Sequence, residues 1–333
     1  MYGAGCWAKQ QYQMLADFGV IFDGVGVDEK YWKSNDSFFD LKINPIEALT
    51  KKYPEAALWI GFNLDRESFS SLKKRIQSTL GFTCIYACDC ARFDQFENHN
   101  YKYSQIKEHI DQFQWLFDRL ADEKSKQTLI SYLNQRISGD YQYSENIYDE
   151  HHYFAKDIVH LGQEVFVDCD AYTGDTIQSL YALTTPKKVC AFEPEKANFE
   201  KLQKNYIHDA RVVCLNIGAY SKKTTLSFSA NCTHASKINE HGESKIETDT
   251  IDHVTQGESV TFIKMDIEGA ELEALKGAAE TIQAHHPKLA ISAYHQFEDL
   301  FTLPQYIDSL NSKYKFYLRR HSYLVHELVL YAL

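Results

Sequence analysis

The sequence has no long apolar run and no excess of positive charge. No stretch of 18 or more apolar residues occurs in the 333 residues, and the N-terminus lacks the basic and apolar regions of a signal peptide. The formal net charge is −11, and Lys and Arg form no basic stripe. Because binding to a nucleic-acid backbone needs clustered cations, we exclude nucleic acid as the main partner. We expect a cytoplasmic protein without integral membrane contact.

The sequence also lacks the cysteine spacing of a zinc site. Cys84, Cys88 and Cys90 stand close together, but their spacing is not that of a zinc knuckle and no second pair follows. We therefore interpret this stretch as a buried strand and predict no metal there. Three other cysteines lie in strand-like runs and are expected to be small buried side chains in a reducing compartment: Cys169, Cys190 and Cys214.

The length fits two domains, and a composition of 44% hydrophobic and 24% charged residues is typical of a globular protein. We predict three parts: a small Rossmann-like α/β domain over residues 1–91, a helical linker over 92–160, and a larger α/β domain over 161–333. Helical periodicity and aromatic residues dominate the linker. Its end, residues 141–154, is either a loop crossing the mouth of the larger domain or an ordinary aromatic linker.

The first part begins with a G-x-G-x-x-A turn at Gly3 to Ala8, which leads into a helical pattern. An apolar strand is expected over residues 19–27, and Asp28 follows the glycines by about 20 residues, as the dinucleotide fingerprint requires. Only Met1 and Tyr2 precede the glycines, so the first strand is nearly absent and the unit is degenerate. The domain either binds a nucleotide or has a structural or acceptor-presenting role.

From residue 164 onward, strand-like and helix-like runs alternate regularly, which predicts a mostly parallel sheet. Strands are expected at 165–169, 188–193, 211–217, 260–266 and 289–294, a polar hairpin at 225–230 and 244–248, and one long helix at 269–284. The last two strands, 315–319 and 327–332, are too close for a crossover helix. They must form an antiparallel hairpin that closes the sheet.

The stretch from Val165 to Thr176 reads as a strand, a tight turn and a helix start, where a nucleotide-like cofactor usually binds. Asp168 ends the strand, and Gly174 would let the backbone approach a ligand closely. Glu193 ends the next strand and suits the two hydroxyls of a ribose. Without a second glycine there is no obvious pyrophosphate cradle, which favours S-adenosylmethionine over a dinucleotide. The rest of the predicted cofactor site surrounds these positions: Asp170, Tyr172, Thr173, Asp175 and Pro194.

A longer motif adds a family resemblance. The chain reads Phe262-Ile263-Lys264-Met265-Asp266-Ile267-Glu268-Gly269-Ala270-Glu271, with Phe166-Val167-Asp168-Cys169 and Phe192-Glu193-Pro194 upstream and Tyr294-His295 downstream. From about residue 145 to the end it resembles the FkbM-type family of S-adenosylmethionine-dependent methyltransferases. The resemblance implies a class I methyltransferase-like Rossmann sheet, acceptors such as surface-glycan sugars or hydroxylated metabolites, and contacts of Asn216, Gly218 and Asp266 with the cofactor.

One position departs from the family pattern. The family's first motif usually has glycine where this chain has Asp170. Aspartate is among the few residues that tolerate a positive φ, so we expect the turn to survive. Its carboxylate could face the cationic sulfonium of the cofactor or repel the cofactor's carboxylate.

The candidate catalytic residues follow two strand ends. Asp266, Glu268 and His295 should open toward one crevice, with His295 either a general base or a packed histidine. Lys264 should point to the opposite side of its strand from Met265 and pair with a carboxylate. Asp266 and Glu268 could instead hold a divalent cation, but no third ligand stands at an obvious spacing, so we predict no metal. Part of the acidic motif could also serve as a helix cap.

The sequence therefore predicts an S-adenosylmethionine-dependent O-methyltransferase with a small-molecule or glycan acceptor, and leaves homo-oligomers open. Two alternatives stay open. One is a non-catalytic scaffold whose cofactor turn is damaged by Asp170. The other is a nicotinamide-dependent oxidoreductase that uses the N-terminal glycines.

Overall fold

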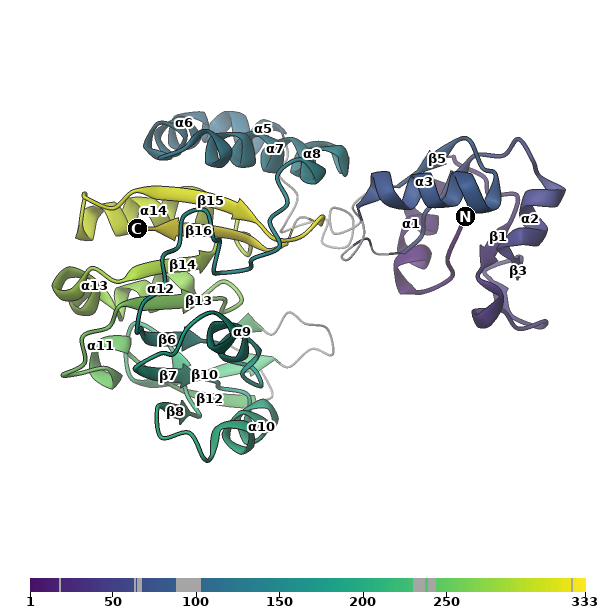
Figure 1. Cartoon of the computed structure of the whole chain (residues 1–333). Helices are drawn as coiled ribbons and strands as arrows, with labels where there is room; N and C mark the ends of the chain where they lie inside the picture. Colours follow the sequence, from purple (N-terminus) through teal and green to yellow (C-terminus); the bar gives the residue numbers. More distant parts are fainter. Residues whose placement is uncertain are drawn as a thin grey trace. The chain divides into compact units, whose positions relative to one another are not determined.

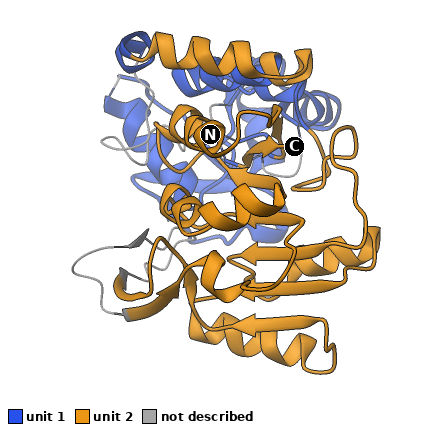
Figure 2. Cartoon of the chain, turned by 90° about the vertical axis from the view of Figure 1, so that its left-hand side faces the viewer, with its two compact units in different colours: residues 1–108, 127–148, 322–326 blue, residues 109–126, 149–321, 327–333 orange. Residues whose placement is uncertain are grey.

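The computed structural model describes residues 1–17, 19–62, 64, 68–87, 103–229, 237–238, 244–324 and 326–333. The chain divides into two compact units, coloured separately in Figure 2. Unit 1 comprises residues 1–108, 127–148 and 322–326, and unit 2 comprises residues 109–126, 149–321 and 327–333.

Unit 1 contains parallel strands in a Rossmann-like order. β1 (Val25–Val27) pairs with β3 (Leu41–Pro45), and β4 (Leu58–Trp59) pairs with β5 (Ile85–Tyr86), both in parallel. Tyr2 joins the two pairs through single parallel bridges to Gly26 and Ile60. The order is therefore β3-β1-Tyr2-β4-β5, and the first strand, predicted to be nearly absent, is reduced to one bridging residue. β2 (Ser37–Phe38) adds to β3 in the antiparallel sense.

In unit 1, α3 begins and ends at residues that favour helix ends. α3 (Phe69–Leu80) has the apolar spacing of an amphipathic helix, and Ser68 caps it by accepting a hydrogen bond from the backbone N–H of Ser71. Gly81 ends it with a φ of 78°. The other helical elements described wholly within this unit are α1 (Cys6–Asp17), η1 (Glu29–Tyr31), α2 (Ile46–Lys52), α5 (Tyr103–Glu108) and α8 (Gln142–Glu145).

Two predictions for unit 1 need correction. The strand expected over residues 19–27 begins only at Val25, because Val20 and Ile21 are exposed and cannot form part of a buried strand. Cys84 is exposed rather than buried, and Cys88 and Cys90 lie outside the described residues.

A seven-stranded sheet forms the centre of unit 2 (Figure 1). Its order is β15-β16-β14-β13-β6-β7-β8, and only β16 runs antiparallel to its neighbours. The predicted parallel sheet with a closing antiparallel hairpin is confirmed. The strands are β6 (Val165–Cys169), β7 (Lys188–Phe192), β8 (Val212–Leu215), β13 (Phe262–Met265), β14 (Lys288–Ser292), β15 (Phe316–Arg320) and β16 (Leu328–Ala332).

The strand order reverses at β6, because the chain continues to β7 on one side and reaches β13 on the other. At such a switch point the connections leave a crevice beyond the carboxyl ends of the strands. Below it, the core is apolar and closely packed: the rings of Phe166 and Phe262 meet edge to face at 5.4 Å, and Phe154 packs against both.

The helices of unit 2 connect these strands. They are α6 (Ile110–Arg119), α9 (Asp175–Leu183), α10 (Lys196–Tyr206), α11 (Ile251–Val254), α12 (Glu271–Lys276), α13 (Ala279–His285) and α14 (Asp299–Leu310). The single helix predicted over residues 269–284 is wrong, since α12 and α13 are separate. The break falls at Gly277, where an added Cβ would lie 2.0 Å from the carbonyl oxygen of Tyr220.

A second sheet has the order β11-β10-β12-β9. β10 (Thr224–Ser229) and β12 (Ser244–Asp249) pair in the antiparallel sense, as the polar hairpin predicted. β9 (Gly218–Ala219) and β11 (Lys237–Ile238) flank them.

The residues of the predicted helical linker are distributed between the two units. α6 packs against α14 in unit 2, where Phe113 contacts the ring of Phe301 on α14 and that of Phe297 just before it. α7 (Glu123–Ser138) begins in unit 2 and continues in unit 1. The three predicted domain boundaries stay predictions. Among the described residues, no helix is both long and apolar enough to cross a membrane.

Gly277→Ala should lower the free energy of unfolding by about 2 kcal/mol or more, because the new methyl group collides with a backbone carbonyl that cannot rotate away. Gly162→Ala is the matched control, since the nearest atom to its added Cβ is 3.8 Å away. It should change stability by less than about 0.5 kcal/mol. Urea unfolding of both variants gives the measurement, and equal stabilities would contradict the packing argument.

Candidate active site

A buried ion pair joins the two central strands of unit 2. Lys264 on β13 stands opposite Asp168 on β6, and its Nζ lies 3.1 Å from Asp168 Oδ1. The same ammonium group donates to the carbonyl oxygens of Cys169 (3.3 Å) and Asp170 (2.9 Å). Lys264, predicted among the catalytic residues and as the partner of a carboxylate, is thus held beneath the turn that follows β6.

Burial affects the two partners in opposite directions. Burial raises the pKa of Asp168 to about 6, and Lys264 opposes that rise. Burial also disfavours the charge of Lys264, but Asp168, Asp266 and Asp170 together hold its pKa above the ordinary value. Lys264 therefore stays charged, and the carboxylates around it are partly compensated.

The turn after β6 has the left-handed backbone at Asp170 that aspartate was expected to tolerate. Asp170, Tyr172 and Gly174 all have positive φ, at 71°, 50° and 93°. The backbone N–H groups of Asp170 and Ala171 both donate to the carbonyl oxygen of Phe192. The replacement of glycine by Asp170 is accommodated, since aspartate is among the residues that enter the left-handed region.

Glu193 is fixed at the exit of β7. It is 1% exposed, and its two carboxylate oxygens accept hydrogen bonds from the backbone N–H groups of Tyr172 and Glu195, each at 2.8 Å. The side chain of Asn216 donates to the carbonyl oxygens of Glu193 and Pro194. Glu193 therefore links the β6 turn to the start of α10.

The carboxyl group of Asp170 lies within hydrogen-bond reach of that of Glu193. Burial and the neighbouring Asp170 raise the pKa of Glu193 to about 9. Burial also raises the pKa of Asp170, and Lys264 opposes the rise. Two adjacent buried carboxyls cannot both be ionised at low cost, so the pair retains one proton at neutral pH.

Other residues predicted to bind the cofactor make hydrogen bonds or close packing contacts within the protein. An added Cβ on Gly174 would lie 2.2 Å from the ring of Tyr206, whose hydroxyl donates to the carbonyl oxygen of Gly174. Thr173 accepts from Asn205 through its carbonyl, and Asp175 opens α9. Gly218 lies in β9, in the second sheet, where it pairs with Thr248.

The acidic motif after β13 and the histidine after β14 lie together. His295 Nδ1 is 2.9 Å from Glu271 Oε1. On the other side of the ring, Nε2 is 3.5 Å from both Asp266 Oδ1 and Glu268 Oε2. Glu268 has a φ of 56°, which is uncommon for a residue of this size and typical of functional turns. The three side chains predicted to open toward one crevice are therefore neighbours.

The charges of this cluster are strongly coupled. Burial lowers the pKa of His295, but Glu271, Asp266 and Glu268 outweigh it and raise the value to about 10. Burial raises the pKa of Glu268 to about 7 despite the nearby histidine. Burial opposes ionisation of Asp266, yet His295 and Lys264 lower its pKa below the ordinary value. The predicted base role of His295 therefore requires that its imidazolium first lose a proton.

Two tyrosines complete the cluster: Tyr294, which stands in the family motif, and Tyr153, and neither was predicted as a site residue. Tyr153 donates to Asp266 Oδ2 at 2.6 Å, and Tyr294 donates to Oδ1 at 3.2 Å. Tyr153 belongs to the aromatic stretch for which a loop at the mouth of the domain was one interpretation. In the sequence, only the high content of tyrosine and histidine in this stretch indicated that it could contribute to the site. Glu271, interpreted in the sequence as a helix cap, bonds both His295 and the N–H of Ile267.

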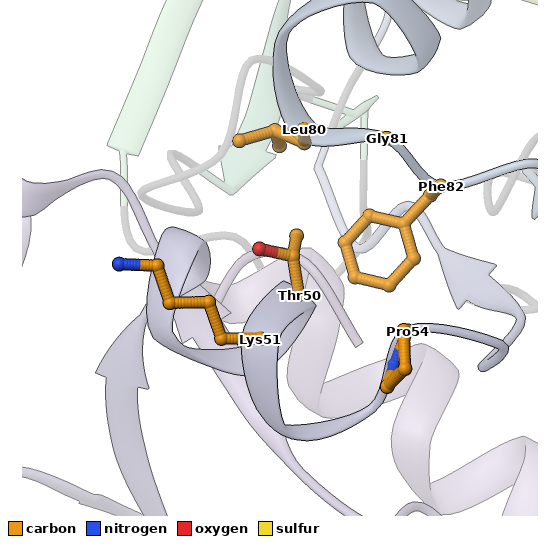
Figure 3. Close-up of a pocket in the computed structure, with 6 residues that line it drawn as sticks. All are labelled: Thr50, Lys51, Pro54, Leu80, Gly81 and Phe82. Carbon is orange, nitrogen blue, oxygen red and sulfur yellow. The ribbon is translucent and has the colours of Figure 1, made fainter.

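Unit 1 offers weaker candidates. A hollow of about 240 Å³ is lined by Thr50, Lys51, Pro54, Leu80, Gly81 and Phe82 (Figure 3). The Thr50 hydroxyl is already bonded to the carbonyl of Glu47, and the Lys51 side chain extends away from the Phe82 ring. At the N-terminal glycine turn, the carboxylate of Asp28 accepts a hydrogen bond from the Tyr2 hydroxyl, and Gly3 packs closely on Gly61. Neither place gathers several convergent polar groups.

Lys264→Met should lower the free energy of unfolding by about 3 to 5 kcal/mol, because Asp168 is left as a buried charge without its partner. The double variant Lys264→Met/Asp168→Asn should recover part of that loss. Lys276→Met is the matched control, since its pairing with Glu273 is exposed and worth less than about 1 kcal/mol. Chemical denaturation distinguishes the cases, and equal losses for Lys264→Met and Lys276→Met would contradict a structural role for Lys264.

Asp170→Asn should stabilise the protein in a pH-dependent way. Because the pKa of Glu193 rises from 4.5 to about 9 on folding, the folded state keeps a proton that the unfolded state releases, and stability falls as pH increases between these values. The substitution removes the like charge, and the new amide can donate to Glu193. We expect a gain of about 1 to 3 kcal/mol near pH 8 and almost none near pH 5.

Thermal unfolding across this pH range measures the effect. Asp118→Asn, on the exposed face of α6, is the control and should show no such trend. A gain from Asp170→Asn that is the same at every pH would contradict the shared proton.

Three comparisons with known proteins agree with this architecture. Residues 168–324 match the family model of the methyltransferase FkbM domain. The crystal structure of methyltransferase FkbM from Methylobacillus flagellatus KT is similar, with a TM-score of 0.72 and 27% identity over 93% of this chain and 83% of that chain.

A curated relative is the hexuronic acid methyltransferase AglP of Haloferax volcanii, 33% identical over 110 residues. The match covers 30% of this chain and 45% of the length of that relative. The FkbM match begins at Asp168 and includes the turn, Glu193 and the whole acidic cluster. The resemblance seen in the sequence is therefore confirmed: residues 168–324 match the methyltransferase FkbM domain, and the chain is similar in structure to a methyltransferase FkbM.

Proposed function

We propose that the chain is an S-adenosylmethionine-dependent methyltransferase that methylates a hydroxyl oxygen of a sugar or glycan. The observation that carries the proposal is the position of Glu193. Its carboxylate is held at the exit of β7 by two backbone N–H groups, beside the turn that opens α9 and at the switch point of the sheet. That is where the ribose of an adenosine cofactor binds in sheets of this order.

The residues at this crevice fit such a cofactor. Each oxygen of Glu193 accepts one backbone hydrogen bond, and a carboxylate oxygen can accept two, so capacity remains for two ribose hydroxyls. The sulfonium group carries a positive charge, which suits the acids around the turn. Asp170 would either bind that charge or give up its contact with Glu193 when the ribose enters. The fit is therefore favourable in charge and in hydrogen-bonding capacity.

When bound, S-adenosylmethionine supplies a methyl group whose bond to sulfur breaks with its electron pair going to sulfur. Glu193 positions the donor through its ribose. The cluster of Asp266, Glu268 and His295 follows the neighbouring strands β13 and β14, and it would hold the acceptor hydroxyl. As the new carbon–oxygen bond forms, the hydroxyl proton passes to a carboxylate of this cluster. Positioning can lower the barrier by several kcal/mol, and a base typically adds about 10²- to 10⁴-fold.

The acceptor class rests on similarity and on chemistry. AglP is described as a hexuronic acid methyltransferase, and sugars of that class present several hydroxyls. The partly exposed carboxylates of Asp266 and Glu268 provide hydrogen-bond acceptors of the kind that sugar hydroxyls need. A scaffold without activity and a nicotinamide-dependent oxidoreductase are the alternatives that the experiment distinguishes.

Glu193→Ala should weaken binding of S-adenosylhomocysteine at least about tenfold, because the hydrogen bonds to the ribose are lost. Isothermal titration calorimetry with the full chain makes the measurement. Glu200→Ala, on the exposed face of α10, is the control and should bind as tightly as the parent. Tight binding of NADH instead of S-adenosylhomocysteine would favour the oxidoreductase.

Activity is tested with S-adenosylmethionine and uronic-acid oligosaccharides. Mass spectrometry should show the addition of one methyl group, at a rate that falls at least about 100-fold in Glu268→Gln or His295→Ala if the cluster receives the proton. Cofactor binding without methylation of any of a panel of sugars and hydroxylated metabolites would favour the scaffold.

A further inference from the structure

We propose that His295, Asp266 and Glu268 form a site for one divalent cation of the Mn²⁺ or Mg²⁺ class. Sequence spacing offers no third ligand beside the two acids, because His295 comes from a different strand. The fold supplies it. The site stands on the geometry below and does not depend on the proposed methyl transfer.

The first observation is the free ring nitrogen of His295. The residue is 8% exposed, and its Nε2 is buried without a hydrogen-bond partner. Leaving such a nitrogen without a hydrogen bond in the interior is costly. Yet Nε2 is directed between two carboxylates, at 3.5 Å from an oxygen of Asp266 and an oxygen of Glu268. A buried nitrogen that makes no hydrogen bond and is aimed at two carboxylates has the placement of a metal ligand.

The distances suit a common ion. Ligand atoms bound at about 2.1 Å to one small cation lie about 3 to 3.5 Å from one another. The two measured separations from Nε2 fall at the upper end of that range. Ligand atoms of Asp266, Glu271 and His295 lie within 4.8 Å of one another, so two of the three proposed ligands belong to a group compact enough for one ion.

A second layer of contacts orients these ligands. Glu271 is bonded to Nδ1 of His295 at 2.9 Å, which leaves Nε2 as the ligating nitrogen. Metal-bound histidines usually have such a carboxylate or carbonyl partner on the other nitrogen. Tyr153 and Tyr294 donate to the carboxylate of Asp266 and hold it in place. The left-handed backbone of Glu268, at a φ of 56°, directs that side chain toward the same point.

The ligand set indicates the class of ion. Two carboxylates neutralise a divalent cation, and Mn²⁺ accepts both carboxylate oxygen and imidazole nitrogen. Three protein ligands would leave positions open for water or a hydroxyl. There the cation would polarise an acceptor hydroxyl and ease the loss of its proton. That role rests on the proposed function, whereas the cation site itself does not.

Direct binding of Mn²⁺ to the metal-free full chain tests the site. The electron paramagnetic resonance signal of free Mn²⁺ should fall with one ion bound per chain, and Mg²⁺ should compete. Glu268→Gln should weaken the affinity at least about tenfold, since it removes one anionic ligand and keeps the size of the side chain. Its side chain is 31% exposed, so the variant should fold, and its circular dichroism spectrum checks this.

His295→Gln supplies a second variant with the same expected loss. Glu298→Gln is the matched control: this exposed acid lies three residues beyond His295 and should leave the affinity unchanged. Equal Mn²⁺ affinity in the parent and in folded Glu268→Gln would overturn the site, as would no binding to a parent chain that still binds S-adenosylhomocysteine. Mn²⁺ binding without methyl transfer would leave the site standing and count against the proposed function alone.

Discussion

One buried cation organises the crevice of unit 2. The ammonium group of Lys264 lies between the two central strands, paired with Asp168 and bonded to the carbonyl oxygens of the turn after β6. It also lies 5.1 Å from the centre of the Tyr153 ring, and it helps to keep Asp266 ionised. Because an unpaired buried charge costs several kcal/mol, the acids on both sides could not be held in the interior without it. The turn after β6 and the acidic cluster after β13 thus share one electrostatic support.

The sequence predicted the parts of the fold that depend on local pattern. Apolar runs separated by helical periodicity indicated the parallel sheet, and the short connection before residue 327 required the closing hairpin, which β15 and β16 form. The sequence did not predict features of the fold that depend on contacts with residues far away in the chain. At the break between α12 and α13, Gly277 lies against the carbonyl of Tyr220, more than 50 residues earlier in the chain, and the sequence does not indicate that contact. Likewise, Tyr2 serves as a strand only because Gly26 and Ile60 are brought beside it.

The candidate site shows the same division between local and distant information. Strand ends identified Asp168, Glu193, Asp266 and His295, because parallel strands place their carboxyl ends at one edge of the sheet. The partners of these side chains could not be predicted. Whether Glu271 caps a helix or bonds His295 depends on how far apart two loops lie. In the structure, the Glu271 carboxylate makes both contacts, with the backbone N–H of Ile267 and with the ring of His295. Two further contacts also depend on distances in space, which the spacing along the sequence does not indicate. They are the pairing of Asp170 with Glu193 and the hydrogen bond from Tyr153 to Asp266.

The balance of charge around Lys264 connects the two proposals. Six acids, Asp168, Asp170, Glu193, Asp266, Glu268 and Glu271, surround two basic groups, Lys264 and His295. The protein on its own limits the resulting repulsion by retaining protons, as the raised pKa values of Glu193 and Glu268 indicate. A ligand that brings positive charge removes the need for those protons. A sulfonium beside Asp170 would do so on one side of Lys264, and a divalent cation between Asp266 and Glu268 would do so on the other. Both positively charged ligands would be attracted by the same group of acids, so binding of one would weaken the attraction for the other. Binding both at once therefore requires a marked excess of acidic over basic groups.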